Sequence, residues 1–126
     1  MNLNQVTISS VNLNKAIEFY ELLGLTLIVR SDDDYARFVC PGSNHSTFSI
    51  QRAEVVDPLN GTIIYFECDN LDQKVEALED KGITFLERPT DKTWLWRESY
   101  LQDPDGNMIC LYYAGENRLN PPWKIK

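Results

Sequence analysis

The chain repeats one order of strand and helix, and this repeat limits the possible folds more than any other feature. Residues 5–9 (QVTIS) alternate apolar and polar side chains and precede a helical pattern that ends at Gly24. The order returns at residues 63–67 (IIYFE), which precede a helical pattern that ends at Gly82. Two copies of one supersecondary unit usually pack as a pseudo-symmetric pair. Any site between the copies is therefore expected to use equivalent positions in both.

The length predicts a single domain over 1–126. It divides into a first unit at about 3–52, a linker at 53–60, a second unit at about 61–114 and a C-terminal tail at 115–126. Each half would be marginally stable alone, because small units bury too little surface. The 43% apolar residues suffice for a core, and the 25% charged residues are typical of a globular surface.

Composition excludes several classes of partner. The net charge is −7, with 12 basic residues against 19 acidic ones, so nucleic acid is not an expected partner. No apolar run approaches the roughly 18 to 20 residues of a membrane span, and residues 1–4 do not resemble a signal region. We expect a cytoplasmic protein without a membrane partner. Cys40, Cys68 and Cys110 are widely spaced and predict buried free thiols.

Periodicity predicts the elements of both units. In the first unit we expect a strand at 5–9, a helix capped by Asn12 and ended by Gly24, and strands at 25–31, 35–40 and 46–52, with a turn at 41–44. In the second unit we expect a strand at 61–68, a helix at 71–81, and strands at 83–88, 96–102 and 107–113. The tail is expected to be irregular, with Trp123 packed on the body or on a neighbouring chain.

Two motifs, residues 12–25 (NLNKAIEFYELLGL) and 103–111 (DPDGNMICL), together with the repeat, resemble the vicinal oxygen chelate superfamily. This superfamily includes glyoxalases, extradiol dioxygenases and bleomycin resistance proteins. The resemblance implies an α+β fold of two βαβββ units, whose curled mixed sheets form a cup with the helices outside. It also implies either a metal-dependent enzyme or a metal-free binding protein.

Enzymes of the superfamily hold a divalent metal with side chains that correspond by resemblance to Gln5, Ser49, Ile63 and Cys110. Only Gln5 is a familiar ligand at its position. Metals that act as Lewis acids need three or more His, carboxylate or thiolate ligands, and this chain has one histidine, His45, in a polar turn. We therefore expect no metal and no other cofactor.

Strand parity, set by the resemblance, then predicts which side chains line the cup. The expected ligand-binding residues are polar or aromatic for the most part: Gln5, Thr7, Ser49, Gln51, Ile63, Tyr65, Glu67, Trp96, Glu98, Tyr100, Met108, Cys110 and Tyr112. Such a lining suits a small aromatic or cationic molecule, although the tyrosines could instead fill the cup themselves. The opposite strand faces are apolar and should pack beneath the helices.

Glu67 and Glu98 are the candidate catalytic residues, since a carboxylate among aromatic walls can act as a general base. Each could equally anchor a cationic ligand or turn outward at a strand end. Cys110 has no histidine nearby in the sequence, so a packed thiol is favoured over a nucleophile.

Three functions remain open. The favoured hypothesis is a metal-free protein that binds a small molecule, as bleomycin resistance proteins do. The alternatives are a lyase, isomerase or dioxygenase-like enzyme with an atypical site, for which a glyoxalase-like lyase is the first choice, and an interaction module with a vestigial cup. We expect a homodimer in each case, with the cup formed within one chain or across the two-fold axis.

Overall fold

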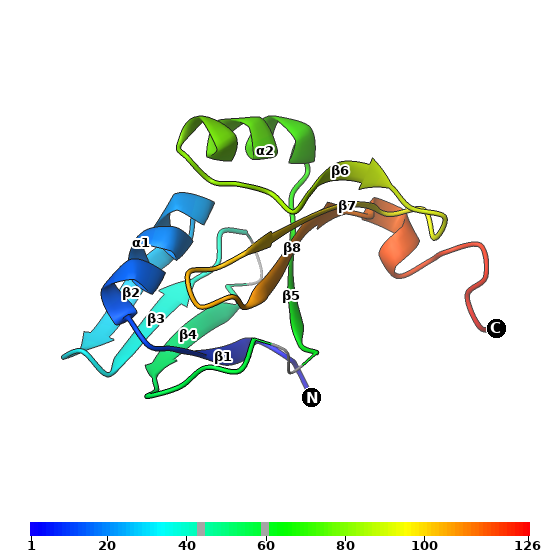
Figure 1. Ribbon diagram of the computed structural model, residues 1–126. Helices are drawn as coiled ribbons and strands as arrows, with labels where there is room; N and C mark the ends of the chain where they lie inside the picture. Colours follow the sequence, from blue (N-terminus) through cyan, green and yellow to red (C-terminus); the bar gives the residue numbers. More distant parts are fainter. Residues whose placement is uncertain (43–44, 59–60) are drawn as a thin grey trace. The chain divides into compact units, whose positions relative to one another are not determined.

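The structure is a computed structural model that describes residues 1–42, 45–58 and 61–126. The described part forms two compact units, Met1–Asn60 with Asp103–Gly106, and Gly61–Gln102 with Asn107–Lys126. Residues 43–44 of the predicted turn and residues 59–60 of the predicted linker lie outside the described part. Figure 1 shows the order of the elements along the chain.

The first unit contains one helix and four strands. They are β1 (Gln5–Ser10), α1 (Leu13–Leu23), β2 (Thr26–Ser31), β3 (Tyr35–Val39) and β4 (Thr47–Arg52). The sheet order is β1-β4-β3-β2, in which β1 and β4 are parallel and the other pairs are antiparallel.

The second unit repeats this arrangement. It contains β5 (Ile63–Glu67), α2 (Leu71–Asp80), β6 (Glu87–Asp91), β7 (Arg97–Gln102), β8 (Met108–Tyr113) and a short 3₁₀ helix, η1 (Gly115–Arg118). The sheet order is β5-β8-β7-β6, again with only the first pair parallel. The prediction of an α+β fold with two βαβββ units and mixed sheets is confirmed.

The alternation of apolar and polar residues determines which face of each sheet its helix covers. Phe48 and Ile50 of β4 and Ile109 and Leu111 of β8 are almost fully buried, as the strand parity predicts. Helix α1 begins after Asn12, whose Oδ1 accepts a hydrogen bond from the backbone N–H of Lys15 at 3.1 Å. We call the sheet face that the helix does not cover the open face.

The strand predicted at 83–88 was placed too early, since β6 spans Glu87–Asp91. Helix α2 closes with a hydrogen bond from the backbone N–H of Ile83 to the carbonyl of Leu78 at 3.0 Å. The chain first bonds to the sheet at Leu86, whose backbone N–H donates to the carbonyl of Tyr100 at 2.8 Å. Pro89 is tolerated within β6 because β6 is an edge strand. The apolar residues after Gly82 therefore form a crossing segment rather than a strand.

The tail is more ordered than predicted in one place and less packed in another. Gly115–Arg118 forms η1, whereas Trp123 is 57% exposed and does not pack closely on this chain. Among the described residues, no helix is long and apolar enough to cross a membrane. The cytoplasmic location stays a prediction.

The turn between β7 and β8 belongs to the first unit. The hydroxyl of Tyr20, on α1, donates a hydrogen bond to Asp103 Oδ2 at 2.7 Å, and both residues are buried. Asp105 Oδ1 accepts from the backbone N–H of Val11 at 2.9 Å. Burial, with Asp103 and Asp105 nearby, raises the pKa of Tyr20 above its usual range, so the ring stays a neutral donor.

Replacing Tyr20→Phe should lower the free energy of unfolding by about 1 to 3 kcal/mol, because it leaves the buried Asp103 carboxylate without this donor. Urea titration followed by circular dichroism measures the change. Tyr113→Phe, on a ring that is 43% exposed, is the matched control and should shift stability by less than about 0.5 kcal/mol. Equal effects of the two substitutions would contradict a structural role for the buried bond.

Candidate functional site

The open face of the second sheet brings together most of the predicted binding residues of that half. The ladder pairs Tyr65 with Cys110 and Cys110 with Tyr100, so these three side chains form one row across the sheet. The next row pairs Glu67 with Tyr112 and Tyr112 with Glu98. Side chains directly opposite one another in a sheet lie on the same face and in contact.

Three aromatic rings pack together on this face. The rings of Trp96 and Tyr112 are stacked, with centroids 4.7 Å apart and planes inclined by 18°. Tyr65 meets both rings edge-on, at 5.5 Å from Tyr112 and 6.2 Å from Trp96. Tyr112 is buried while Tyr65 is 44% exposed, so the cluster fills part of the face and offers an accessible ring at its edge.

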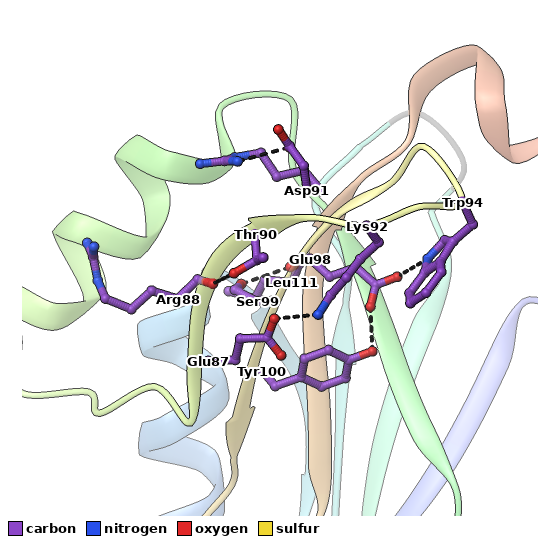
Figure 2. A network of polar contacts seen from close by, with 11 residues as sticks. Glu87, Arg88, Thr90, Asp91, Lys92, Trp94, Glu98, Ser99, Tyr100 and Leu111 are labelled. Atoms are coloured by element: carbon purple, nitrogen blue, oxygen red, sulfur yellow. Dashed lines mark hydrogen bonds and ion pairs between the residues drawn. The ribbon is translucent and has the colours of Figure 1, made fainter.

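Glu98, which pairs with Tyr112 in the ladder, has a hydrogen-bond network of its own, which Figure 2 shows. The side chain is 2% exposed. Its Oε2 accepts from Trp94 Nε1 at 2.6 Å, and its Oε1 accepts from the Tyr100 hydroxyl at 2.5 Å. A buried carboxylate is stable only with such partners, so Trp94 and Tyr100 hold Glu98 in place.

A second polar pair adjoins this network. Lys92 Nζ forms an ion pair with Glu87 Oε1, as Figure 2 shows. The pKa of Lys92 is raised by the hydrogen bond to Glu87, and more weakly by Glu98 and Cys110. Lys92 is thus the ion-pair partner of Glu87.

Cys110 and Tyr100 are neutral parts of this face. Burial, with a smaller effect of Glu98, raises the pKa of Cys110 to about 12. Burial and the hydrogen bond to Glu98 also raise the pKa of Tyr100 above its usual range. The thiol is not activated as a nucleophile, because activation needs a lowered pKa.

Glu67 has a different role from Glu98. Its Oε2 accepts hydrogen bonds from the backbone N–H groups of Ala114 at 2.8 Å and Gly115 at 2.9 Å. Its Oε1 lies 3.8 Å from Arg118 Nε. The carboxylate therefore anchors the start of η1, where an anion is favourable. These contacts make Glu67 a structural residue at the border of the open face.

The open face of the first sheet is a network of neutral groups and one arginine. Gln5 Nε2 donates to Ser49 Oγ at 2.7 Å, and Gln5 Oε1 accepts from the hydroxyl of Thr47. The Tyr35 hydroxyl lies 2.7 Å from Ser49 Oγ, and Arg37 Nε donates to Tyr35 at 2.9 Å. The predicted residues Gln5, Thr7 and Ser49 are thus brought together, but they bond to one another.

The side chains at the positions of the family's metal ligands do not fit a divalent ion. Gln5 and Ser49 of the first unit are neutral and already share a hydrogen bond. In the second unit Ile63 has no donor atom, and Cys110 is a protonated thiol. Within the described residues, no group of three or more His, Cys, Asp or Glu side chains is placed to hold a metal ion. Lewis-acid sites need several anionic or imidazole ligands, so we derive no step through a metal.

Several members of the network were not predicted as site residues. Glu87 lies opposite Tyr100 in the observed register of β6. The strand predicted at 83–88 did not give this register, so the pair was not predicted. Lys92 belongs to the hairpin between β6 and β7, where the three-dimensional turn decides its partner. Conversely, the predicted residue Gln51 donates to the carbonyl of Asp34 at 3.0 Å and is held by a loop. Predicted residues Ile63 and Met108 are paired in the ladder at one end of the face.

Residues 2–111 match the family model described as Glyoxalase/Bleomycin resistance protein/Dioxygenase superfamily. The chain is 28% identical over 125 residues to an uncharacterized protein of Bacillus subtilis (strain 168), YraH, covering 89% of this chain and 98% of that protein. It is 29% identical over 120 residues to a probable trivalent organoarsenical cleaving enzyme of the same organism, covering 89% of this chain and 80% of the enzyme.

Solved structures resemble the chain in fold. A glyoxalase/bleomycin resistance protein/dioxygenase from Nocardioides has a TM-score of 0.78 and 22% identity, covering 100% of this chain and 90% of that one. A lactoylglutathione lyase from Agrobacterium tumefaciens has a TM-score of 0.73 and 17% identity, covering 89% and 92%. At these identities the likeness concerns the fold, and a shared fold does not imply a shared activity.

Replacing Glu67→Gln should loosen η1 and lower the free energy of unfolding by about 1 kcal/mol, because the amide is a weaker partner for two backbone N–H groups and Arg118. Hydrogen exchange at the Gly115 amide should accelerate in the same variant. Glu116→Gln, on an exposed residue of η1, is the charge-matched control and should leave both quantities nearly unchanged. Unchanged exchange at Gly115 in Glu67→Gln would refute the anchoring role.

Proposed function

This chain belongs to the Glyoxalase/Bleomycin resistance protein/Dioxygenase superfamily, and on that premise we propose that it binds a small aromatic or cationic molecule without a metal ion. The binding surface is the open face of the second sheet. The observation that carries the proposal is the cluster of Tyr65, Trp96 and Tyr112 beside the buried carboxylate of Glu98. Flat aromatic surface with a few fixed polar groups is typical of small-molecule sites.

The chemistry of this face supports both parts of the ligand description. Aromatic pairs contribute about 0.5 to 1.5 kcal/mol beyond the area that they bury, so the exposed ring of Tyr65 favours a planar partner. The same rings attract cations through their π faces. The chain's net charge of −7 adds a weak attraction for positively charged ligands.

The enzymatic alternative would rely on Glu98 rather than Glu67. Glu67 is engaged by the backbone of η1, whereas Glu98 faces Tyr100 and Trp94 on the aromatic side. The names of similar proteins supply the substrate classes to test, namely lactoylglutathione and trivalent organoarsenicals. The neutral Gln5, Ser49, Ile63 and Cys110 set argues for binding over metal-dependent turnover. Homodimerisation, with no nucleic acid or membrane partner, is part of the same proposal.

Truncating Trp96→Ala should weaken binding of aromatic probes by at least about tenfold, because it removes the ring stacked on Tyr112. Two probes of one shape, (4-hydroxyphenyl)trimethylammonium and 4-tert-butylphenol, cover the cationic and the neutral case. Calorimetric titration measures the affinities, and a thermal shift that depends on probe concentration supports them. Trp123→Ala in the exposed tail is the control and should bind like the unaltered protein. The proposal fails if neither probe binds the unaltered protein.

The purified chain should retain less than about a tenth of an equivalent of metal after dialysis against zinc, nickel, cobalt, manganese and iron(II), since its donor set suits none of them. Elemental mass spectrometry gives the stoichiometry. One equivalent of metal per chain would overturn the metal-free proposal, and turnover of the two substrate classes would then be assayed with and without chelator.

A further inference from the structure

Glu98 is a buried carboxylate whose hydrogen-bond partners are neutral. Its two oxygens accept from the indole N–H of Trp94 and the hydroxyl of Tyr100, and the side chain is 2% exposed. A carboxylate has about four acceptor positions, and these bonds use one on each oxygen. Neutral donors stabilise a buried charge less than an ammonium group does, so Glu98 retains a strong preference for a cation.

No cation among the described residues forms an ion pair with Glu98. Glu87 and Glu98 are two neighbouring carboxylates, and Lys92 is the cation beside them. Lys92 forms its ion pair with Glu87. Glu87 also raises the pKa of Lys92 more than Glu98 does. Arg97, next to Glu98 in the sequence, instead bonds Asp72 and Asp91. In the part of the chain that the structure describes, the ion pairs of this network therefore bypass Glu98, whose hydrogen-bond partners are the neutral Trp94 and Tyr100.

Trp94 covers Glu98 from an accessible position. The indole ring is 44% exposed although its N–H is bonded to the buried carboxylate. Trp94 stands at the tip of the hairpin between β6 and β7, and the following residue, Leu95, has a φ of 68°. A non-glycine residue with positive φ is held at a cost by its surroundings. The hydrogen bond from Trp94 to Glu98, drawn in Figure 2, helps to hold this tip in place.

We propose that Glu98 is the subsite for the positive group of an organic cation, and that the ligand takes the place of the Trp94 indole N–H on the carboxylate. The inference rests on the proposed function, because it assigns a ligand class to the same open face. An ammonium or guanidinium group attached to an aromatic ring matches the site. Its charge meets Glu98, and its ring meets the exposed Tyr65. Tyr100 keeps its bond to Glu98 and fixes the carboxylate during the exchange.

The test compares the cationic probe (4-hydroxyphenyl)trimethylammonium with its neutral isostere 4-tert-butylphenol at neutral pH on the full chain. The unaltered protein should bind the cation at least about tenfold more tightly than the isostere. In Glu98→Gln, an isosteric change, this preference should fall below about twofold, as measured by the ratio of the two affinities within the variant. Glu18→Gln on the exposed surface of α1 is the charge-matched control and should keep the full preference.

Trp94→Phe tests the displacement separately. Phenylalanine keeps a ring at the hairpin tip but donates no hydrogen bond, so the cation no longer competes with the indole N–H, and its affinity should rise about threefold or more. The isostere should bind this variant as it binds the unaltered protein. Because Trp94→Phe preserves the charge of Glu98, it also tests the site if Glu98→Gln folds poorly.

The outcomes separate this inference from the proposed function. Binding of neither probe to the unaltered protein overturns both. Equal binding of the two probes, or a preference that survives in Glu98→Gln, overturns the cation subsite and leaves aromatic binding standing. Weaker cation binding in Trp94→Phe overturns the displacement, because Trp94 would then be a wall of the site.

Discussion

The buried hydrogen bond from Tyr20 to Asp103 fixes the turn from which β7 and β8 run, and the candidate site depends on these two strands. β7 contains Glu98 and Tyr100, and β8 contains Cys110 and Tyr112. A shift of one strand of this pair by one residue would turn the two site side chains of that strand to the face that α2 covers. The bond between α1 and the turn thus stabilises the chain at the point where an error in register would remove the site.

The two glutamates of the second sheet differ in burial and in hydrogen-bond partners, since Glu67 is exposed and Glu98 is buried. Glu67 ends β5, where the backbone N–H groups of Ala114 and Gly115 satisfy it, and the result is an ordered start of η1. Glu98 lies inside β7, where it has only an indole and a phenol as donors. The same residue type therefore holds η1 at one position, and at the other it is the carboxylate of the proposed binding site. The difference comes from the exposure and the partners of each side chain, although both residues belong to the same row across the sheet.

The sequence predicts those parts of the structure that follow from periodicity. The repeat and the alternation of apolar residues were sufficient for the elements of the two βαβββ units, and the resemblance to the superfamily set the strand face on which Phe48, Ile50, Ile109 and Leu111 are buried. They failed at β6, because Thr84, Phe85 and Leu86 resemble a strand but cross from α2 to the sheet edge. Because of that error, the ion pair between Glu87 and Lys92 was not predicted. Its prediction requires the register of β6, an edge strand that contains a proline. The bonds of Trp94 and Glu67 depend on the shape of a hairpin and of η1, which no local pattern specifies.

The two open faces differ in the hydrogen bonds that a ligand would have to replace. This difference favours the second sheet as the proposed binding surface. In the first sheet Gln5, Ser49 and Tyr35 bond to one another, so a ligand would have to replace bonds that are already satisfied by matched partners. In the second sheet the corresponding Ile63 and Cys110 offer little polar competition, and the rings and Glu98 dominate. Under the proposed function, a cationic ligand would gain aromatic contact and an ion pair there while displacing one neutral hydrogen bond. Loss of metal-binding side chains in this half therefore leaves a surface with its own recognition chemistry, in which charge selectivity depends on a single carboxylate.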